Sequence, residues 1–320
     1  MFEGALSFPL FGVQVYAYGL MVMLGCWLGF AVILFLSRGK ENERKAASLT
    51  ALLSLPLGIL LSRALYCLGD PSFAPLMNLK NALDVTTGGF SMYGALMGAV
   101  LAALTASRFS GVKPARTLDL LSPALAAFLI PARLGEGFTT LGVSRPLTTP
   151  WLSDSFLAMR DEYDAYLRTY LLEAFIALVI LLVLLRKLSG KPQNGRVFTL
   201  GCLLYGVTQT LMESLRYDGH LRHSFIGVQQ VLSAALFSGV IILLAVRLLR
   251  HQAGSKALPL LSLILLPLIL GGIVGAEFMV DRSALGKLFS YALYLLILAF
   301  PLVLGILLHQ QEGRIEQRTD

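Results

Sequence analysis

The sequence predicts an all-α, polytopic integral membrane protein, and three observations support this. Of the 320 residues, 56% are hydrophobic and only 14% are charged, and the mean hydropathy is +0.72. A soluble domain carries about 25% charged residues. The apolar residues gather in runs of about 20, the length that crosses a bilayer. The formal net charge of +7 does not indicate nucleic-acid binding, because the basic residues lie in short loops between these runs.

Each apolar run is predicted to be one membrane-spanning helix surrounded by membrane lipids. Nine runs can be marked, although hydropathy alone would allow eight, since the third is short and rich in glycine. No stretch outside them suggests a separate soluble domain. The predicted spans are 14–36, 47–68, 89–107, 117–135, 167–186, 197–214, 225–248, 257–280 and 288–309.

The distribution of basic residues predicts the orientation of the spans. Arg38 and Lys40 follow the first run, Arg186 and Lys187 follow the fifth, and similar residues follow the third, seventh and ninth. Short loops rich in Lys and Arg stay in the cytoplasm. We therefore expect a multi-pass protein whose N-terminus faces outward and whose C-terminus is cytoplasmic.

The longest predicted outer segment, 137–168, contains Trp151, Tyr163 and Tyr166. Tryptophan and tyrosine are enriched at the membrane–water interface. The segment could therefore lie along the membrane or cover a site. A plain connecting loop is an equally open interpretation.

The cysteines do not indicate a disulfide or a metal centre. All of them lie inside apolar runs and none has a CxxC spacing. We interpret them as small buried residues. No His, Cys and Asp cluster with the spacing of metal ligands occurs, so the sequence does not indicate a metal site. The cysteines are Cys26, Cys67 and Cys202.

Arg133 is the most informative single residue, because it ends an almost uncharged run, Leu118 to Leu134. An arginine within a membrane span costs about 3 kcal/mol or more by insertion scales, so it is a functional-site hypothesis by default. Its forked guanidinium suits a phosphate better than other side chains do. We therefore predict that Arg133 binds a phosphate-bearing lipid headgroup.

Other polar residues are predicted to gather at the same outer membrane depth. Tyr205, Gln209, Glu213 and Arg216 have spacings that place them on one helical face. A polar face turned toward lipid would be unstable, so this face must meet protein or a polar cavity. The others are Arg63 and Tyr66, Ser91 and Tyr93 after Gly88 and Gly89, Glu136, and Glu173.

Two simpler interpretations remain open for these residues. The charged groups could form a structural ion-pair network, in which Glu213 and Glu173 neutralise Arg133 and its neighbouring arginines. Gly94 and Gly98 form a GxxxG pattern that favours close helix packing over ligand approach.

Several short motifs occur in an order that resembles the phosphatidylglycerol–prolipoprotein diacylglyceryl transferases of bacteria. The resemblance covers about residues 10–248 and implies a seven-helix core over residues 1–250. Residues 251–320 would then be two additional helices and a short cytoplasmic tail. The motifs are Tyr18-Gly19-Leu20-Met21, Gly88-Gly89-Phe90-Ser91, Ala132-Arg133-Leu134-Gly135, and Tyr205-Gly206 through Glu213 to Arg216.

The resemblance implies a reaction at the extracytoplasmic side of the bacterial cytoplasmic membrane. The thiol of the lipobox cysteine of a preprolipoprotein would attack the glycerol carbon that bears the phosphate ester of phosphatidylglycerol. A diacylglyceryl thioether would form and glycerol phosphate would leave, without a metal or organic cofactor. The partners are therefore phosphatidylglycerol and the preprolipoprotein signal peptide.

The same resemblance assigns roles to residues. Arg133 would hold the phosphate and stabilise the departing dianion, and Glu213 would orient an arginine. The residues predicted to act in catalysis are Arg133, Tyr93, Glu213 and Tyr205. Those predicted to bind substrate are Tyr18, Arg63, Ser91, Glu136, Glu173, Gln209 and Arg216.

This chain departs from the family pattern at three of these positions. Tyr93 replaces the histidine expected as thiol base, and a phenol with a reference pKa of about 10 is a poorer base than an imidazole at about 6.5. Gln209 replaces an arginine and Glu136 replaces an asparagine, which makes the expected pocket more negative. Residues after the sixth run could compensate by supplying a base or a cation; they are Arg216, His220, Arg222 and His223.

Two other functions remain as alternatives, the first suggested by these departures and the second by the arginines within the membrane spans. A divergent paralogue would bind a lipid or an exported peptide without the transfer reaction. A transporter or flippase would use the arginines to line a route for an anionic lipid. The second alternative predicts polar residues through the inner halves of the third to sixth runs, where the sequence has few.

Overall fold

The computed structural model describes residues 6–10, 13–69, 89–190, 192–219, 221–250, 255–282 and 286–319. The chain divides into two compact units, each of which is described by itself. The first unit contains residues 1–198 and 216–221, and the second contains residues 199–215 and 222–320. Gly88 and His220 lie outside the described residues.

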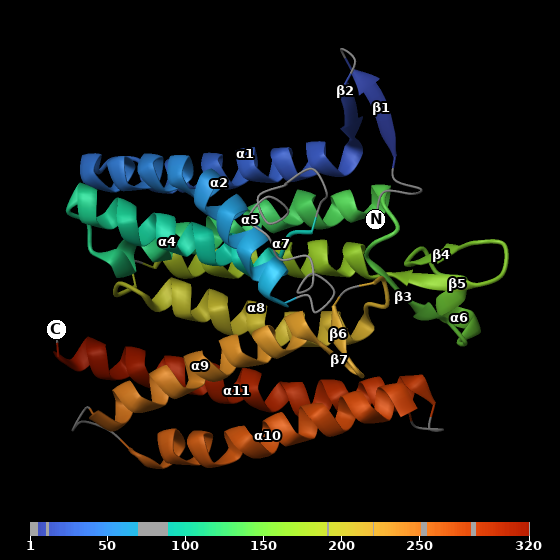
Figure 1. The fold of residues 1–320 in the computed structure, drawn as a ribbon. Helices are drawn as coiled ribbons and strands as arrows, with labels where there is room; N and C mark the ends of the chain where they lie inside the picture. The colour runs from blue at the N-terminus through green and yellow to red at the C-terminus, as the bar shows by residue number, and fades with distance from the viewer. Residues whose placement is uncertain are drawn as a thin grey trace. The chain divides into compact units, whose positions relative to one another are not determined.

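Five long helices build the first unit (Figure 1). Helix α2 packs along α4, and α5 packs between α1 and α7. Because their apolar side chains leave few polar groups in the contacts, these helices associate largely through van der Waals packing. The helices are α1 (Ala17–Leu36), α2 (Glu41–Gly69), α4 (Met92–Ser110), α5 (Pro114–Gly135) and α7 (Thr169–Ser189).

Glycines let α4 approach α2 closely. A Cβ atom added at Gly94 would lie 2.4 Å from the main-chain oxygen of Leu61, and one added at Gly98 would lie 2.5 Å from that of Leu57. Real Cβ atoms do not come so near, so any larger residue would push the helices apart. The GxxxG pattern therefore serves helix packing, as predicted.

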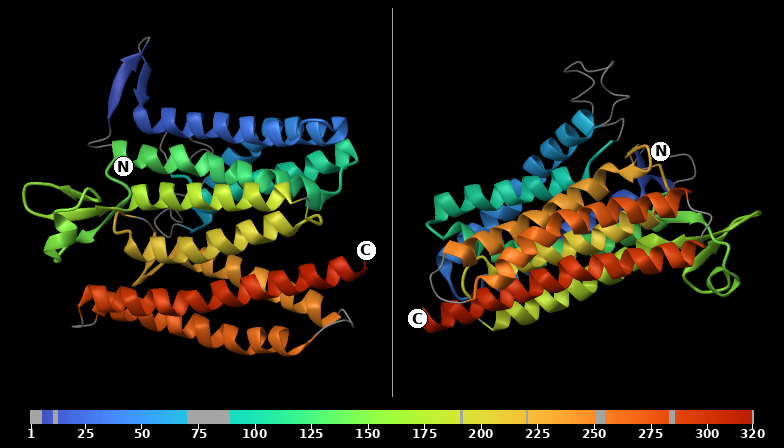
Figure 2. Two further views of the ribbon diagram at one scale, coloured as in Figure 1. Left: turned by 180° about the vertical axis from the view of Figure 1, so that it is seen from behind. Right: turned by 90° about the horizontal axis from the view of Figure 1, so that it is seen from below.

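Two small sheets accompany these helices (Figures 1 and 2). A hairpin of β1 (Ser7–Leu10) and β2 (Val13–Tyr16) leads directly into α1. The segment 137–168 is not a plain connecting loop, because it folds into an antiparallel sheet of strand order β3-β5-β4 with the short helix α6. Trp151 and Tyr163 are largely exposed in this segment. The sheet elements are β3 (Val143–Pro146), α6 (Pro150–Ser153), β4 (Ala158–Arg160) and β5 (Ala165–Arg168).

Four long helices and one short hairpin build the second unit, although the first turn of α8 belongs to the first unit. Helices α9, α10 and α11 pack against one another. Their core contains the buried side chains of Phe237, Ile241, Leu244 and Tyr294. The elements are α8 (Arg196–Leu215), β6 (Arg222–His223), β7 (Ile226–Gly227), α9 (Val228–Arg250), α10 (Ala257–Arg282) and α11 (Lys287–Thr319).

A long helix occupies each of the nine ranges predicted from the sequence, and the all-α polytopic class is confirmed. Within the described part of the chain, seven helices are long and apolar enough to cross a membrane: α1, α2, α4, α5, α9, α10 and α11. Helices α7 and α8 are not among these seven, and α8 carries the buried polar residues Gln209 and Glu213.

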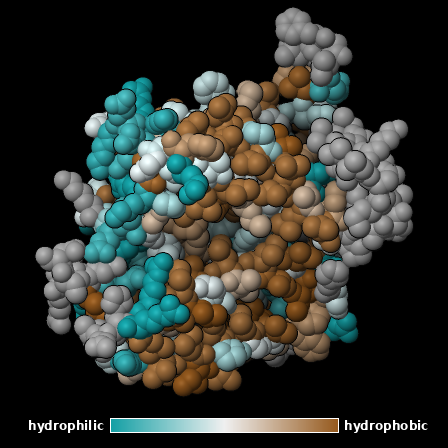
Figure 3. All heavy atoms as spheres, turned by 60° about the vertical axis from the view of Figure 1, so that its left-hand side comes forward, coloured by the Kyte–Doolittle hydropathy of each residue, from teal (hydrophilic) through white to brown (hydrophobic). Residues whose placement is uncertain are grey.

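Apolar side chains dominate the surface of the helices, as they must where lipid replaces water. Trp27, Leu52 and Leu268 are each 68% exposed, which would be unusual on a soluble protein. Figure 3 shows the same property on one face, where a broad hydrophobic area is bordered by hydrophilic residues toward one side of the view.

Candidate functional site

Arg133 lies in the last turn of α5 and is 3% exposed. Its Nη1 donates to Oε1 of Glu136 at 2.7 Å, and its Nε lies 2.8 Å from Oε2 of Glu173. Glu136 follows the last residue of α5, and Glu173 lies in the first turns of α7. The end of one helix and the start of another therefore supply two carboxylates to one arginine.

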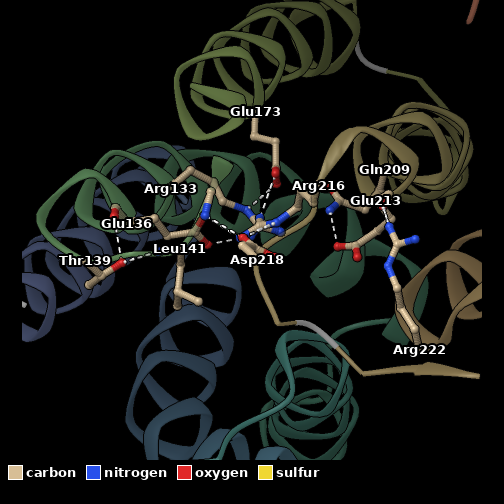
Figure 4. Close-up of polar contacts among 11 residues, drawn as sticks. Arg133, Glu136, Thr139, Leu141, Glu173, Gln209, Glu213, Arg216, Asp218 and Arg222 are labelled. Carbon is tan, nitrogen blue, oxygen red and sulfur yellow. Dashed lines mark hydrogen bonds and ion pairs between the residues drawn. The ribbon is translucent and has the colours of Figure 1, made fainter. Parts of the chain in front are cut away.

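A second arginine contacts the same two glutamates. Nη2 of Arg216 donates to Oε2 of Glu136, and its Nη1 donates to Oε1 of Glu173, both at 2.7 Å. Each glutamate therefore bridges the two arginines through its two oxygens (Figure 4). We call this closed arrangement of Arg133, Glu136, Arg216 and Glu173 the ion ring.

Asp218 adds a third carboxylate to the ion ring, and sequence reasoning did not identify it. Its Oδ2 accepts from Nη2 and Nε of Arg216 at 3.0 and 3.2 Å, and also from the main-chain N–H of Gly142. The side chain of Asp218 is fully buried. The sequence did offer one signal, because Asp218 is an acidic residue two positions after the predicted site residue Arg216. Alternate residues of an extended segment share a face, so these two side chains could have been expected to lie together.

The ion ring with Asp218 has a formal charge of one negative unit, from two arginines and three carboxylates. Removing one partner of such a buried pair costs about 3–5 kcal/mol, because the other charge is left uncompensated. The geometry therefore agrees in part with the simpler interpretation, in which these charged groups form a structural ion-pair network. It also holds the Arg133 guanidinium in one orientation.

The Tyr18-Gly19-Leu20-Met21 and Ala132-Arg133-Leu134-Gly135 motifs pack together. A Cβ atom at Gly135 would lie 2.7 Å from Cβ of Met21 and 3.3 Å from Cδ2 of Tyr18. Tyr18 is also within electrostatic range of Glu136, Arg133 and Arg216. The structure thus brings together four predicted site residues besides Arg133: Tyr18, Glu136, Glu173 and Arg216.

Arg63 and Ser91 hold the start of α4 against α2. Nη1 of Arg63 donates to the main-chain oxygen of Gly89 at 3.1 Å, and its guanidinium lies 5.9 Å from the ring centroid of Tyr66. Ser62 Oγ donates to the main-chain oxygen of Ser91 at 2.7 Å. The Ser91 hydroxyl in turn accepts from Gly94 N at 3.4 Å and caps α4.

Tyr93, which replaces the expected histidine, lies in the first turn of α4. Its side chain is 7% exposed and therefore belongs to the interior of the first unit.

The predicted polar face of α8 is only partly correct. Gln209 Nε2 donates to Oε1 of Glu213 at 3.0 Å, as the spacing of four residues allows, and both side chains are buried. The side chain of Tyr205 lies one turn before Gln209 on the same face. Arg222 adds a hydrogen bond from Nη2 to the main-chain oxygen of Glu213 at 3.1 Å (Figure 4).

The prediction that Arg216 shares this helical face is wrong. Helix α8 ends at Leu215, and Arg216 forms an antiparallel bridge with Ser144 instead. This main-chain bridge to β3, together with the ion pairs to Glu136 and Glu173, holds Arg216 outside the helix.

Asp119 is a second buried acid that sequence reasoning passed over. It lies in the run described as almost uncharged and is fully buried. Its Oδ2 accepts from Gly195 N at 2.6 Å and its Oδ1 from Phe198 N at 2.9 Å. Asp119 therefore caps the start of α8, where main-chain N–H groups have no helical partner.

The arrangement offers no metal centre among the residues that the structure describes. No group of three or more His, Cys, Asp or Glu side chains there is placed to hold a metal ion. Every carboxylate of the ion ring faces arginine instead.

Comparison with known proteins identifies the family. The family model described as prolipoprotein diacylglyceryl transferase matches residues 5–246. A phosphatidylglycerol–prolipoprotein diacylglyceryl transferase of Finegoldia magna is 27% identical over 239 residues, covering 74% of this chain and 93% of that protein. The protein of that name from Clostridium novyi is 22% identical over 242 residues, covering 74% and 94%.

A third relative of the same name, from Lactobacillus acidophilus, is 26% identical over 253 residues, covering 74% of this chain and 87% of that protein. The matched region includes every predicted site residue, whereas α10 and α11 lie beyond it. The chain belongs to the prolipoprotein diacylglyceryl transferase family.

Proposed function

We propose that this protein transfers a diacylglyceryl group from phosphatidylglycerol to the lipobox cysteine of preprolipoproteins. The sulfur forms a bond to the glycerol carbon, the bond from that carbon to the phosphate oxygen breaks, and the thiol proton is lost. Glycerol phosphate is the leaving group. The observation that carries the proposal is the family match over residues 5–246, which includes Arg133 and its ion-ring partners.

Arg133 is the proposed phosphate-binding residue. A fixed cation beside the departing phosphate stabilises the charge that develops as the bond breaks. Glu136 and Glu173 fix the orientation of this guanidinium before substrate arrives. Arg216 pairs with the same two glutamates, and its positive charge helps to compensate their negative charges.

We place the reaction on the extracytoplasmic side of the bacterial cytoplasmic membrane. The distribution of basic residues supports an external N-terminus, and Arg133 then lies at the outer end of α5. Phosphatidylglycerol of the outer leaflet and an exported signal peptide would both be accessible there.

The alternative is a divergent paralogue that binds a lipid or an exported peptide without transfer. Two observations favour it. Glu136 gives the ion ring with Asp218 a net negative charge, and Gln209, at a position where the resemblance implies an arginine, pairs with Glu213 as a neutral amide.

Complementation distinguishes these two functions. We would express the full chain in a bacterium depleted of its own transferase and follow lipoprotein modification by gel shift and labelled-lipid incorporation. Modification is expected with the wild type and should disappear in Arg133→Ala. Arg160→Ala is the matched control, because Arg160 is an exposed arginine paired with Asp154 outside the helices.

The outcome decides between the candidates. Modification that survives in Arg133→Ala would overturn the proposed role of this arginine. A well-expressed wild-type chain that modifies no lipoprotein, although a family member with the expected histidine and arginine does so in the same strain, would favour the paralogue.

A further inference from the structure

Helices α10 and α11 lie beyond the family match, yet the second unit buries polar side chains from both. Glu277 of α10 is 1% exposed and Tyr294 of α11 is 0% exposed. An ionisable or polar side chain inside a membrane helix is costly unless it has partners in the protein. Helices α10 and α11 therefore contribute buried polar side chains as well as a lipid-facing surface.

Gln230 of α9 joins these side chains into one cluster. Its Nε2 donates to Oε2 of Glu277 and to the hydroxyl of Tyr294, both at 2.8 Å. Its side-chain oxygen accepts from Gly227 N at 3.2 Å. Both ends of the Gln230 amide are thus engaged, and its orientation is set. We call Gln230, Glu277 and Tyr294 the amide cluster.

The amide cluster continues to α8. The hydroxyl of Tyr294 donates to the main-chain oxygen of Thr210 at 3.5 Å, and that of Tyr291 donates to the main-chain oxygen of Ser214 at 3.0 Å. The Ser214 carbonyl lies in the last turn of α8, where carbonyls lack a helical partner. One tyrosine on each of two successive turns of α11 therefore holds the C-terminal half of α8.

These two carbonyls are next to predicted site residues. Thr210 follows Gln209, and Ser214 follows Glu213. Closer to its start, α8 is also held tightly, because a Cβ atom at Gly206 would lie 3.0 Å from the main-chain oxygen of Ser233. Contacts to α9 and α11 thus restrain α8 near its start and along its C-terminal half.

We propose that the α10–α11 pair positions the Gln209–Glu213 face of α8 through the hydroxyls of Tyr291 and Tyr294. Glu277 and Gln230 keep the Tyr294 hydroxyl in place. These are positioning residues and not catalytic ones, because they act through the α8 main chain. The consequence for transfer rests on the proposed function, whereas the consequence for α8 does not.

The test uses the full chain in lipid nanodiscs, with the variants Tyr291→Phe, Tyr294→Phe and the double variant. Each removes one hydroxyl and keeps the ring. Tyr163→Phe is the matched control, since Tyr163 is 88% exposed in the outer segment. We would measure hydrogen exchange by mass spectrometry, the unfolding temperature, and kcat and KM for transfer to a lipobox peptide.

We expect faster exchange in peptides covering 209–215, with unchanged exchange in the middle of α10 and α11. Each lost hydrogen bond should accelerate exchange, and lower kcat, about two- to tenfold, with little change in KM. The control should match the wild type in every measurement. A general loss of protection throughout the second unit would mean that the tyrosines only stabilise the fold, and would overturn the proposal.

The remaining outcomes separate the two hypotheses. Unchanged exchange over 209–215 would overturn the positioning role directly. Faster exchange with unaltered kcat would overturn its importance for the reaction. Faster exchange in a chain whose wild type has no transfer activity would support the positioning of α8 and overturn the proposed function.

Discussion

In the first unit the carboxylates of Glu136 and Glu173 are paired with arginines, whereas in the second unit Glu213 and Glu277 are paired with glutamine amides. Both arrangements are buried. An arginine pair is costly to break, because it leaves a bare charge in the interior. A hydrogen bond to an amide contributes less, about 1.5–3 kcal/mol when one partner is charged.

This difference predicts different tolerance to mutation. The ion ring should respond to the loss of any member with a large drop in stability or activity. The glutamine-paired acids of the second unit should tolerate substitution of their partners better.

The largest effect is expected at Arg133. Arg133→Lys keeps the positive charge but loses the forked donor geometry, so transfer should fall at least about a hundredfold while the protein still accumulates in the membrane. The measurement is labelled-lipid incorporation into a lipobox peptide, with Arg160→Lys as the control. Near-normal transfer would remove Arg133 as the phosphate-binding residue.

Next in size is Glu173→Gln, which retains the shape of the side chain but leaves Arg133 and Arg216 with one shared carboxylate fewer. We expect a loss of about 3 kcal/mol or more in the free energy of unfolding. Denaturant unfolding in mixed micelles checks this, with Glu162→Gln, an exposed acid, as the control. Equal stability of both variants would mean that the ion ring is dispensable.

Gln209→Arg converts the amide pair of the second unit into an arginine–carboxylate pair. We expect a higher rate of transfer, since the variant adds a cation, and a guanidinium favours binding of an anionic phosphate. Gln209→Glu, which places a like charge beside Glu213, should lower the rate. If both variants behave alike, charge at this position does not govern the reaction.

The smallest effect is expected for Tyr93→His, which should raise transfer modestly or leave it intact. An imidazole with a reference pKa near 6.5 would add a rising limb to the pH–rate profile around that pH. The check is the profile of kcat/KM in wild type and variant. Complete loss of transfer would mean that the surroundings of Tyr93 are built for the phenol.

The helices themselves could be predicted because lipid imposes a simple length and composition rule. Each apolar run had to satisfy its own main-chain hydrogen bonds, so each became a helix. The boundaries at Leu36 and Gly135 differ from the prediction by at most a residue. The outer segment was harder, because short strands depend on pairing partners far along the chain.

The candidate site was predictable in part. Arg133 and Glu173 stood out because charges are rare in apolar runs, and they do pair. Arg216 was assigned to the right cluster for an incorrect reason, since helical periodicity was extended one residue past the true helix end. Asp218 gave only a weak signal, because a charge just outside a span resembles any loop residue.

Sequence and tertiary structure therefore determine different features of this protein. Composition and local motifs determined the membrane class, the helices and the family, since hydrophobic length and short-range spacing are properties of neighbouring residues. The closed ion ring and the hold of Tyr291 and Tyr294 on α8 required the folded chain. Apart from the local pair of Arg133 and Glu136, the partners are 40 to 84 positions apart, and no local pattern specifies which of several buried polar groups will meet.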